Sequence, residues 1–524
     1  MYFNNLDFFI LGIYCIGIIT LAQYVSRNES GIEKTSEDYF LAGRSLPWWA
    51  IGASLIAANI SAEQIIGMSG QGYVVGMAIA TYELTAAIAL IVMAKYFLPI
   101  FIEKQIYTMP QFLEQRFDKW VCLVLSLFWL AVYIFINLTS VLWLGSLAIN
   151  SLTGMDITYG LWALAALSLA YSLWGGLKAV ALTDAIQVTL LIFGGLAVSY
   201  IALDKIAESQ GALVGFQILL EALPEKFDMI LDSDNPSYSD LPGVWVLIGG
   251  LWVAHFAYWG FNQYITQRAL GAKSLQEAQK GVMFAAFLKI LMPLVIVLPG
   301  ICAVVLLPTL ETGEFDTAYP QMMALLPSGL LGLTFAALVA AIVSSLASMT
   351  NSVSTIFTMD IYKQFLASDV TDKKLVVVGR NVAFISIIIA VLCAQPLLGN
   401  LESAFQYIQN FTGFFTPGIL VIFLVALFWK KATSLSVLVA AIASLFLSLG
   451  MYLMAPDDFP FQHRMGIVFL VTGFLCYITA LLQGYEDQDK AIILEDINFL
   501  TSKGFNISAF IIFILLTIIY TIWW

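Results

Sequence analysis

Long apolar stretches follow one another along the whole chain, separated by short polar or glycine-containing segments. Each stretch can cross a hydrocarbon core of roughly 30 Å as a helix that rises about 1.5 Å per residue. The pattern therefore predicts an all-α membrane protein with fourteen transmembrane helices. We expect them near residues 7–26, 47–73, 76–101, 119–151, 155–174, 177–203, 243–268, 275–308, 328–364, 373–398, 400–428, 431–455, 463–485 and 505–524.

Polar residues and glycines interrupt two of these spans. The second span contains the segment NISAEQ, and the seventh contains HFAYWGFNQ. A membrane-spanning helix tolerates broken backbone hydrogen bonds where the backbone lines a cavity. Two broken helices in corresponding positions of two five-helix halves are typical of inverted-repeat transporters. The alternative is that the small residues only allow close helix packing.

A lysine lies in the middle of the eighth apolar stretch. Lys289 would cost at least a few kcal/mol in lipid, so we expect it to face a polar cavity and a partner. The other deep candidates are Glu63, Glu83, Asp184 and His255, and we expect most remaining charges at span ends or in loops. The alternative for Glu83 and Lys289 is an ion pair that only holds helices together. For Glu63 we expect hydrogen bonds to the backbone groups that the helix break leaves unpaired.

The composition agrees with a membrane protein, since 60% of residues are hydrophobic, 11% are charged and the mean hydropathy is +0.89. Basic residues are unevenly divided between alternate loops. One set of loops holds eighteen of them, and the other holds only Lys205, Lys226 and Arg464. The positive-inside bias places the larger set in the cytoplasm and both termini outside it.

We divide the chain into five parts: 1–46, an extra helix and cytoplasmic loop; 47–203, the first repeat; 204–242, an acidic outer loop with a short helix; 243–428, the second repeat; and 429–524, three C-terminal helices. The first span lacks a basic start and a small-residue cleavage site, so we expect it to be retained rather than removed as a signal peptide.

Several functional classes are disfavoured. The net charge of −12 gives no support to nucleic-acid binding. The five cysteines are scattered through apolar spans without disulfide or metal-thiolate spacing. We find no nucleophile–base pair and no His/Glu metal motif, so the chain is not expected to be an enzyme.

The ninth span suggests an ion site. Ala341, Ser344 and Ser345 have i, i+3 and i+4 spacing and share one helix face. Two neutral hydroxyls beside carbonyls freed by a broken helix suit a weakly held hard cation. We expect sodium, because a tight calcium site would need more carboxylates. Alternatively, the serines only pack closely against a neighbouring helix.

Several long motifs occur in the order typical of one transporter family. They are ASLIAANISAEQIIGMSG, GGLKAVALTDAIQ, WGFNQYITQRAL, AQKGVMFAAFLK, AAIVSSLASMTNSVSTIFTMDIY and FQYIQNFTG. Together they resemble the sodium/solute symporter family over nearly the whole chain. The resemblance implies a leucine-transporter-type 5+5 inverted repeat that works by alternating access.

The resemblance also implies roles for individual residues. In a galactose-carrying member of the family, matching residues hold the sugar, close the site and bind sodium. The sugar site then consists of Gln64, Glu83, Lys289 and Gln409; Tyr258 is the inner gate and stacks on the sugar, and Met68 and Phe405 form the outer cover. The sodium ligands are the carbonyls of Ala57, Ile60 and Ala341 and the hydroxyls of Ser344 and Ser345, with Asp184 near the ion's exit.

Two positions depart from the family pattern. His255 replaces an asparagine of the sugar ring, and Ala86 replaces a serine, although Thr85 lies beside it. We expect His255 to contact the sugar and both changes to affect sugar identity rather than transport. The alternative for His255 is a hydrogen bond to a neighbouring helix.

These features predict a multi-pass symporter of the bacterial inner membrane that couples inward sodium flow to uptake of a galactose- or glucose-like hexose. Its expected partners are the sugar, the sodium ion and the lipid bilayer. One alternative is the same machine with another polyol such as an inositol, a sialic acid or an amino acid. A substrate carboxylate would favour an arginine as its partner, and we expect no arginine deep in any span. A second alternative is a sugar sensor or leak without coupling.

Overall fold

The computed structural model describes residues 3–25, 41–106, 108–308, 310, 314–367, 369–399, 404–456 and 458–524. Much of the expected first loop, residues 26–40, lies outside the described residues. Helices form almost all of the regular structure in the described chain, whose one β-contact is an isolated bridge between Leu46 and Ala272. The predicted all-α class is therefore confirmed.

The helices that build the protein have the following bounds: α1 (Asn5–Val25), α3 (Trp48–Asn59), η2 (Glu63–Met68), α4 (Ser69–Val74), α5 (Thr81–Val92), α8 (Lys119–Ala131), α9 (Thr139–Thr153), α10 (Ile157–Ile206), α11 (Ala212–Ala222), α13 (Leu251–His255), η7 (Phe256–Phe261), α14 (Gln263–Leu270), α15 (Leu275–Leu306), α17 (Leu330–Thr355), α18 (Asp372–Leu398), α19 (Ala404–Phe428), α20 (Ser434–Met454), α21 (Phe461–Leu482) and α22 (Lys503–Ile522).

Ten helices of the described chain are long and apolar enough to span a membrane, and the bent pair of α3 with residues Glu63–Val74 makes an eleventh. The first predicted span lies on α1, which contains the apolar segment Asn5–Ile18, and the fifth lies on the first part of α10, which contains the apolar segment Ile157–Ala170. The seventh is divided into short pieces because its backbone is broken. The described chain is thus a multi-pass membrane protein.

The fifth and sixth predicted spans differ from the expectation of two separate helices. The structure assigns one uninterrupted helix, α10, to residues 157–206. Only the two glycines at 175–176 separate the two apolar stretches, and this segment is helical in the structure. At about 1.5 Å per residue α10 is far longer than one bilayer crossing needs.

Both predicted breaks are present. Helix α3 ends at Asn59, where Ile60 leaves the helical region with φ −81° and ψ 85°. The chain then turns by 61° into η2 and α4. In the seventh span, the π-helical turn η7 ends at Asn262, which is extended with φ −71° and ψ 126°. π-Helical turns are frequent at functional sites, and one lies beside each break.

Glycines bring α15 close to the first broken helix. A Cβ atom on Gly52 would lie 2.6 Å from the carbonyl oxygen of Gly281, and one on Gly300 would lie 2.0 Å from that of Ser69. Any larger residue at these positions would force the helices apart. The close approach places Lys289, between the two α15 glycines in sequence, against the break in the first helix.

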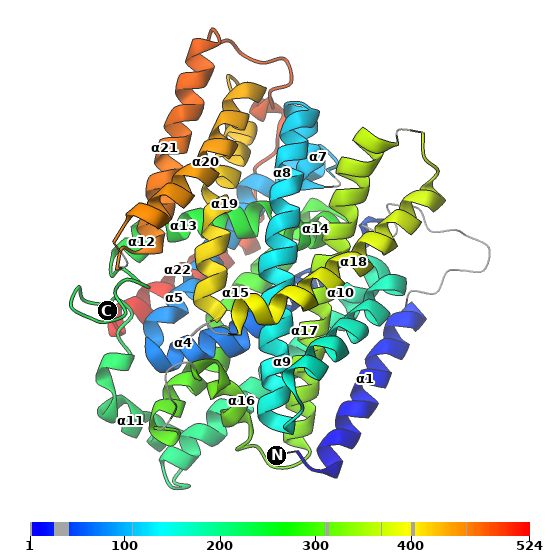
Figure 1. Cartoon of the computed structure of the whole chain (residues 1–524). Coiled ribbons are helices and arrows are strands. Elements are labelled where there is room, and N and C mark those ends of the chain that lie inside the picture. Colours follow the sequence, from blue (N-terminus) through cyan, green and yellow to red (C-terminus); the bar gives the residue numbers. More distant parts are fainter. Residues whose placement is uncertain are drawn as a thin grey trace.

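Figure 1 shows how the helices surround this centre. Helices α20 and α21 lie beside α19 at one edge, and α1 lies at the opposite edge against α10 and α17. Asp7 near the start of α1 accepts hydrogen bonds from the N–H groups of Gly329 and Gly332. Helix α22 packs on α15 and α5, and its C-terminal Trp523 carbonyl accepts from the N–H of Met229.

Candidate functional site

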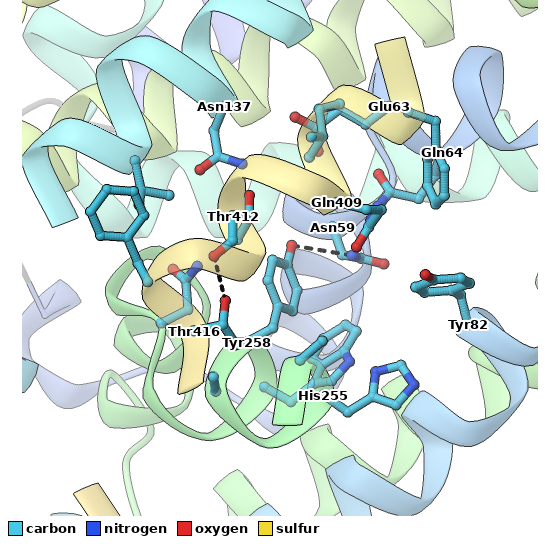
Figure 2. A pocket seen from close by; sticks show the side chains of 18 of the residues that line it. Asn59, Glu63, Gln64, Tyr82, Asn137, His255, Tyr258, Gln409, Thr412 and Thr416 are labelled. Atoms are coloured by element: carbon cyan, nitrogen blue, oxygen red, sulfur yellow. Dashed lines mark hydrogen bonds between the residues drawn. The ribbon is translucent and has the colours of Figure 1, made fainter. Parts of the chain in front are cut away.

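A cavity lies between the two breaks. Its walls come from the first break, α5, the seventh span, α15, α19 and the helix that follows α8 (Figure 2). Every residue predicted for the sugar ring and the gates lines this cavity: Gln64, Met68, Glu83, His255, Tyr258, Lys289, Phe405 and Gln409. Their roles remain predictions, but the fold brings them to one place.

Lys289 is 1% exposed, and its ammonium contacts one carboxylate and two neutral groups. Its ammonium donates to the Glu83 carboxylate at 2.6 Å and to the Asn59 side-chain carbonyl. The ammonium also lies 5.1 Å from the centre of the Trp259 ring, within range of a cation–π interaction. The expected partner of the buried lysine is therefore present, and two neutral groups support the pair.

Tyr258 closes one side of the cavity through hydrogen bonds rather than packing alone. Its hydroxyl accepts from the Asn59 amide at 3.1 Å, as Figure 2 shows, and lies 2.7 Å from the Tyr264 hydroxyl. Asn59 thus contacts both Lys289 and Tyr258. One side chain at the end of α3 connects the charged pair to the predicted inner gate.

The predicted outer cover consists of buried side chains around Phe405. The Phe405 ring packs edge-on against Tyr82, with ring centres 5.6 Å apart, and Met68 is buried on the same cavity. The N–H of Ala404, at the start of α19, donates to Asp316 at 3.0 Å. Burial raises the pKa of Asp316 to about 7. A loop carboxyl therefore anchors the helix that carries both Phe405 and Gln409.

His255 both lines the cavity and bonds a neighbouring helix. Its Nε2 lies 2.7 Å from the Thr85 hydroxyl on α5. The side chain is 5% exposed and has Tyr82 and Trp252 edge-on beside it, with ring centres 6.4 and 6.0 Å away. The structure therefore allows both predicted roles of His255, a contact to the sugar and a hydrogen bond to a neighbouring helix.

Glu63 differs from expectation. Its carboxylate faces the cavity beside Asn137, and its Oε1 has no hydrogen-bond partner among the described residues. The Gln64 side chain instead lies 3.5 Å from the N–H of Ser61 at the break. The neighbouring glutamine, and not the glutamate, reaches toward the broken backbone. Glu63 therefore leaves an open acceptor in the cavity.

Carbonyl groups freed at the first break face the serine pair of α17. The N–H of Ser61 bonds Asn59, so the carbonyl of Ala57 lacks its usual donor four residues later. The Ser345 hydroxyl lies 3.3 Å from the Ala57 carbonyl oxygen and 3.4 Å from that of Ala58. These are neutral oxygen ligands of the kind a sodium ion needs.

The remaining predicted sodium ligands occupy the same region with different contacts. Ile60 is the cap of α3, and Ala341 lies one helical turn before Ser345 on α17. The Ser344 hydroxyl points elsewhere and donates to Asp184 at 2.5 Å. To join a cation site with Ser345, the Ser344 hydroxyl would have to leave Asp184.

Asp184 has an arginine partner, which corrects the expectation that no arginine lies deep in a span. Arg268 on α14 is 1% exposed, and its guanidinium lies 3.8 Å from the Asp184 carboxylate. It also donates to the Ser54 hydroxyl at 2.7 Å and the Ser348 hydroxyl at 2.6 Å. This cluster does not belong to the lining of the cavity. The sequence alone predicts a loop position for Arg268, because this residue ends an apolar stretch.

Sequence reasoning also missed neutral residues of the cavity. Asn59 and Asn137 are amides in or beside apolar spans, and Trp259 and Tyr82 are aromatic residues in a chain that is 14% aromatic. Asn59 had a usable signal, because it is the last residue before the break. The aromatic residues had none, since their type is common throughout the chain.

Comparisons with known proteins agree with this architecture. The model of the family described as "Sodium:solute symporter family" matches residues 39–444. The motifs resemble those of a Vibrio sodium/galactose cotransporter. A "Sodium/glucose cotransporter" of Vibrio parahaemolyticus is 50% identical over 99% of this chain and 98% of its own length.

More distant proteins are similar in sequence or in structure. Human "Sodium/myo-inositol cotransporter 2" is 32% identical over 79% of this chain, which spans 65% of that protein. A solved structure of a Na+-coupled sialic acid symporter has a TM-score of 0.79 at 22% identity and covers 91% of this chain and 98% of its own. At that identity the structure supports the fold alone. From the family model and the Vibrio relative, this chain belongs to the sodium:solute symporter family.

Proposed function

We propose that this symporter couples inward sodium flow to the uptake of a hexose by alternating access. The observation that carries the proposal is the Glu83–Lys289 pair in a buried cavity between two broken helices. Glu83 accepts, Lys289 donates, and Gln64 and Gln409 can do either, so they can satisfy several hydroxyls after water leaves. The Vibrio sodium/glucose cotransporter supports a sugar as the solute.

Another neutral polyol is the second candidate, because the human inositol cotransporter is also a relative. A carboxylate substrate fits less well. Lys289 already pairs with Glu83, Glu63 adds a second acid to the wall, and the deep Arg268 is bound to Asp184 outside the cavity. The charges of the wall therefore favour a neutral solute.

We further propose fourteen membrane crossings in the leucine-transporter-type 5+5 arrangement, in the bacterial inner membrane. The apolar segments Asn5–Ile18 of α1 and Ile157–Ala170 of α10, together with the divided seventh span, would complete the number. The proposed orientation, with both termini outside, rests on the distribution of basic residues. Contacts in the structure join segments that this arrangement places on the same side of the membrane. Trp523 meets Met229 on the proposed outer side, whereas Arg116 meets the carbonyls of Trp429 and Lys430 on the inner side.

Sodium would bind where Ser345 meets the carbonyls of Ala57 and Ala58. A membrane potential contributes about 2.3 kcal/mol per charge per 100 mV, so sodium entry can drive solute uphill. If sodium stabilises the conformation that binds the solute, each ligand raises the affinity of the other by the same factor.

We expect Ser345→Ala to raise the sodium concentration for half-maximal uptake by about tenfold, because it removes one oxygen ligand. Uptake is measured against sodium concentration in proteoliposomes. Ser386→Ala is the matched control, since Ser386 is also buried but, within the described part of the chain, its hydroxyl bonds the Ala383 carbonyl of its own helix and no other group. A sodium curve that stays unchanged in Ser345→Ala would contradict the assignment.

Uptake of labelled glucose into proteoliposomes under an inward sodium gradient tests the proposed function. We expect accumulation with sodium and none with potassium in its place. Unlabelled glucose, galactose, inositol and sialic acid are then added as competitors. Competition by a hexose and none by sialic acid supports the assignment, whereas competition by inositol alone favours the second candidate.

A further inference from the structure

The hydroxyl of Thr85 makes two short contacts. Its Oγ1 lies 2.6 Å from the carbonyl oxygen of Thr81, four residues earlier on the same helix, and 2.7 Å from Nε2 of His255. All three side chains are buried. A threonine in a helix often bonds the carbonyl four residues before it, and this bond fixes where its proton lies.

Counting protons decides the tautomer of His255. Each of the two contacts is short enough to require a proton between its atoms, and the hydroxyl has only one. The Thr81 carbonyl has none to give, so the Thr85 proton lies between these two oxygens. If it were donated to Nε2 instead, two oxygen lone pairs would face each other at 2.6 Å. The proton in the other contact therefore comes from Nε2.

A neutral imidazole with its proton on Nε2 has a bare acceptor at Nδ1. No hydrogen bond joins Nδ1 to another described residue, and His255 lines the cavity. The ring cannot turn over without losing Thr85, and Tyr82 and Trp252 stand edge-on beside it. The cavity is therefore lined by an imidazole whose free nitrogen can accept a hydrogen bond but cannot donate one.

We propose that Thr85 is a positioning residue that fixes His255 in the Nε2–H form, so that this position selects for a hydrogen-bond donor on the solute. The inference rests on the proposed hexose function. An asparagine, which occupies the position in the family pattern, can offer either its carbonyl or its amide. The Thr85–His255 pair removes that choice and demands a hydroxyl proton at one carbon of the sugar.

Fluorinated sugars separate a donor from an acceptor. A hydroxyl can donate and accept, a fluorine at the same carbon can only accept weakly, and a hydrogen does neither. Opposite Nδ1, fluorine should be no better than hydrogen, so both the deoxyfluoro and the deoxy hexose should compete about tenfold less well than the parent sugar. Opposite donors such as Lys289, fluorine should replace part of the lost affinity.

The transport experiment uses sodium-driven uptake of labelled hexose with complete sets of monodeoxy and monodeoxyfluoro competitors. We expect wild-type protein to reject both analogues equally at a carbon whose hydroxyl donates to Glu83 and at the carbon opposite Nδ1 of His255. Only the carbon opposite Nδ1 should respond to changes at Thr85 and His255. Thr85→Val frees the imidazole to present Nδ1–H, and His255→Asn supplies an amide, so the fluoro analogue at that carbon should regain affinity over the deoxy analogue in both. Thr85→Ser keeps the hydroxyl and should retain the wild-type pattern.

Nitrogen NMR of histidine tests the tautomer without transport. The chain has two histidines, so His463→Gln on α21 leaves only His255 to observe after labelling with ¹⁵N-histidine. We expect a protonated Nε2 and a bare Nδ1, and a shift toward the other tautomer in Thr85→Val.

Two results would overturn the inference while leaving hexose symport intact. One is hexose uptake with the same fluoro-to-deoxy ratio at every carbon in wild type and both variants. The other is a protonated Nδ1 in the neutral wild-type imidazole. If no hexose is transported or competes, the proposed function itself fails, so the two failures are distinguishable.

Discussion

Lys289→Met and Glu83→Gln are each expected to abolish hexose binding. Either change leaves the partner buried and unpaired, which typically costs about 3–5 kcal/mol, and also removes a charged hydrogen-bonding group from the cavity. Affinity should therefore fall by at least about a hundredfold. Calorimetry in detergent measures binding, and size-exclusion chromatography of the same samples shows whether each variant is folded.

The double variant separates a binding role from a structural one. Lys289→Met with Glu83→Gln leaves no buried charge of this pair, so folding should recover while binding stays lost. Lys95→Met is the matched control, because Lys95 is half-buried and lies over Tyr96 away from the cavity. Recovery of hexose transport in the double variant would show that the pair only holds helices together.

Arg268→Met is expected to destabilise the protein strongly. It leaves the fully buried Asp184 without its cation and the hydroxyls of Ser54 and Ser348 without a donor. Breaking a buried pair in this way typically costs about 3–5 kcal/mol. The measurement is the melting temperature of purified protein in detergent, which should fall well below that of wild type.

A second substitution tests whether the unpaired charge is the cause. Asp184→Asn combined with Arg268→Met should recover much of the lost melting temperature, because no buried charge of the pair remains. Arg380→Met is the control, since Arg380 is exposed on α18. A melting temperature equal to wild type in Arg268→Met would show that the contact to Asp184 contributes nothing to stability.

The helical class, the two breaks and the deep charges of the cavity follow from local sequence for physical reasons. The other cavity residues, among them Gln64, Tyr258 and Gln409, are expected only from the family resemblance. Apolar length identifies a span, and polar residues inside a span identify a cavity, because lipid cannot satisfy them. Lys289 was identifiable because apolar residues flank it on both sides. Its partner Glu83 lies 206 residues away in sequence. The pairing could be predicted only because few other charged residues lie deep in the spans.

Arg268 shows where local reasoning fails. It follows polar residues at the end of an apolar stretch, as arginines at membrane surfaces do, and its burial depends on α14 turning inward after Asn262. The roles of Asn59 and Thr85 depend on partners 230 and 170 residues away. Hydropathy detects the cost of burying a charge, but it cannot identify which neutral groups offset that cost.

Sodium uptake driven by a hexose gradient tests the proposed coupling most directly. Proteoliposomes with equal sodium inside and outside, and no membrane potential, receive an inward hexose gradient. The account predicts transient accumulation of labelled sodium against its own gradient, abolished by Lys289→Met and weakened by Ser345→Ala. Equilibration of hexose without any movement of sodium would contradict it and identify the protein as an uncoupled sugar pathway.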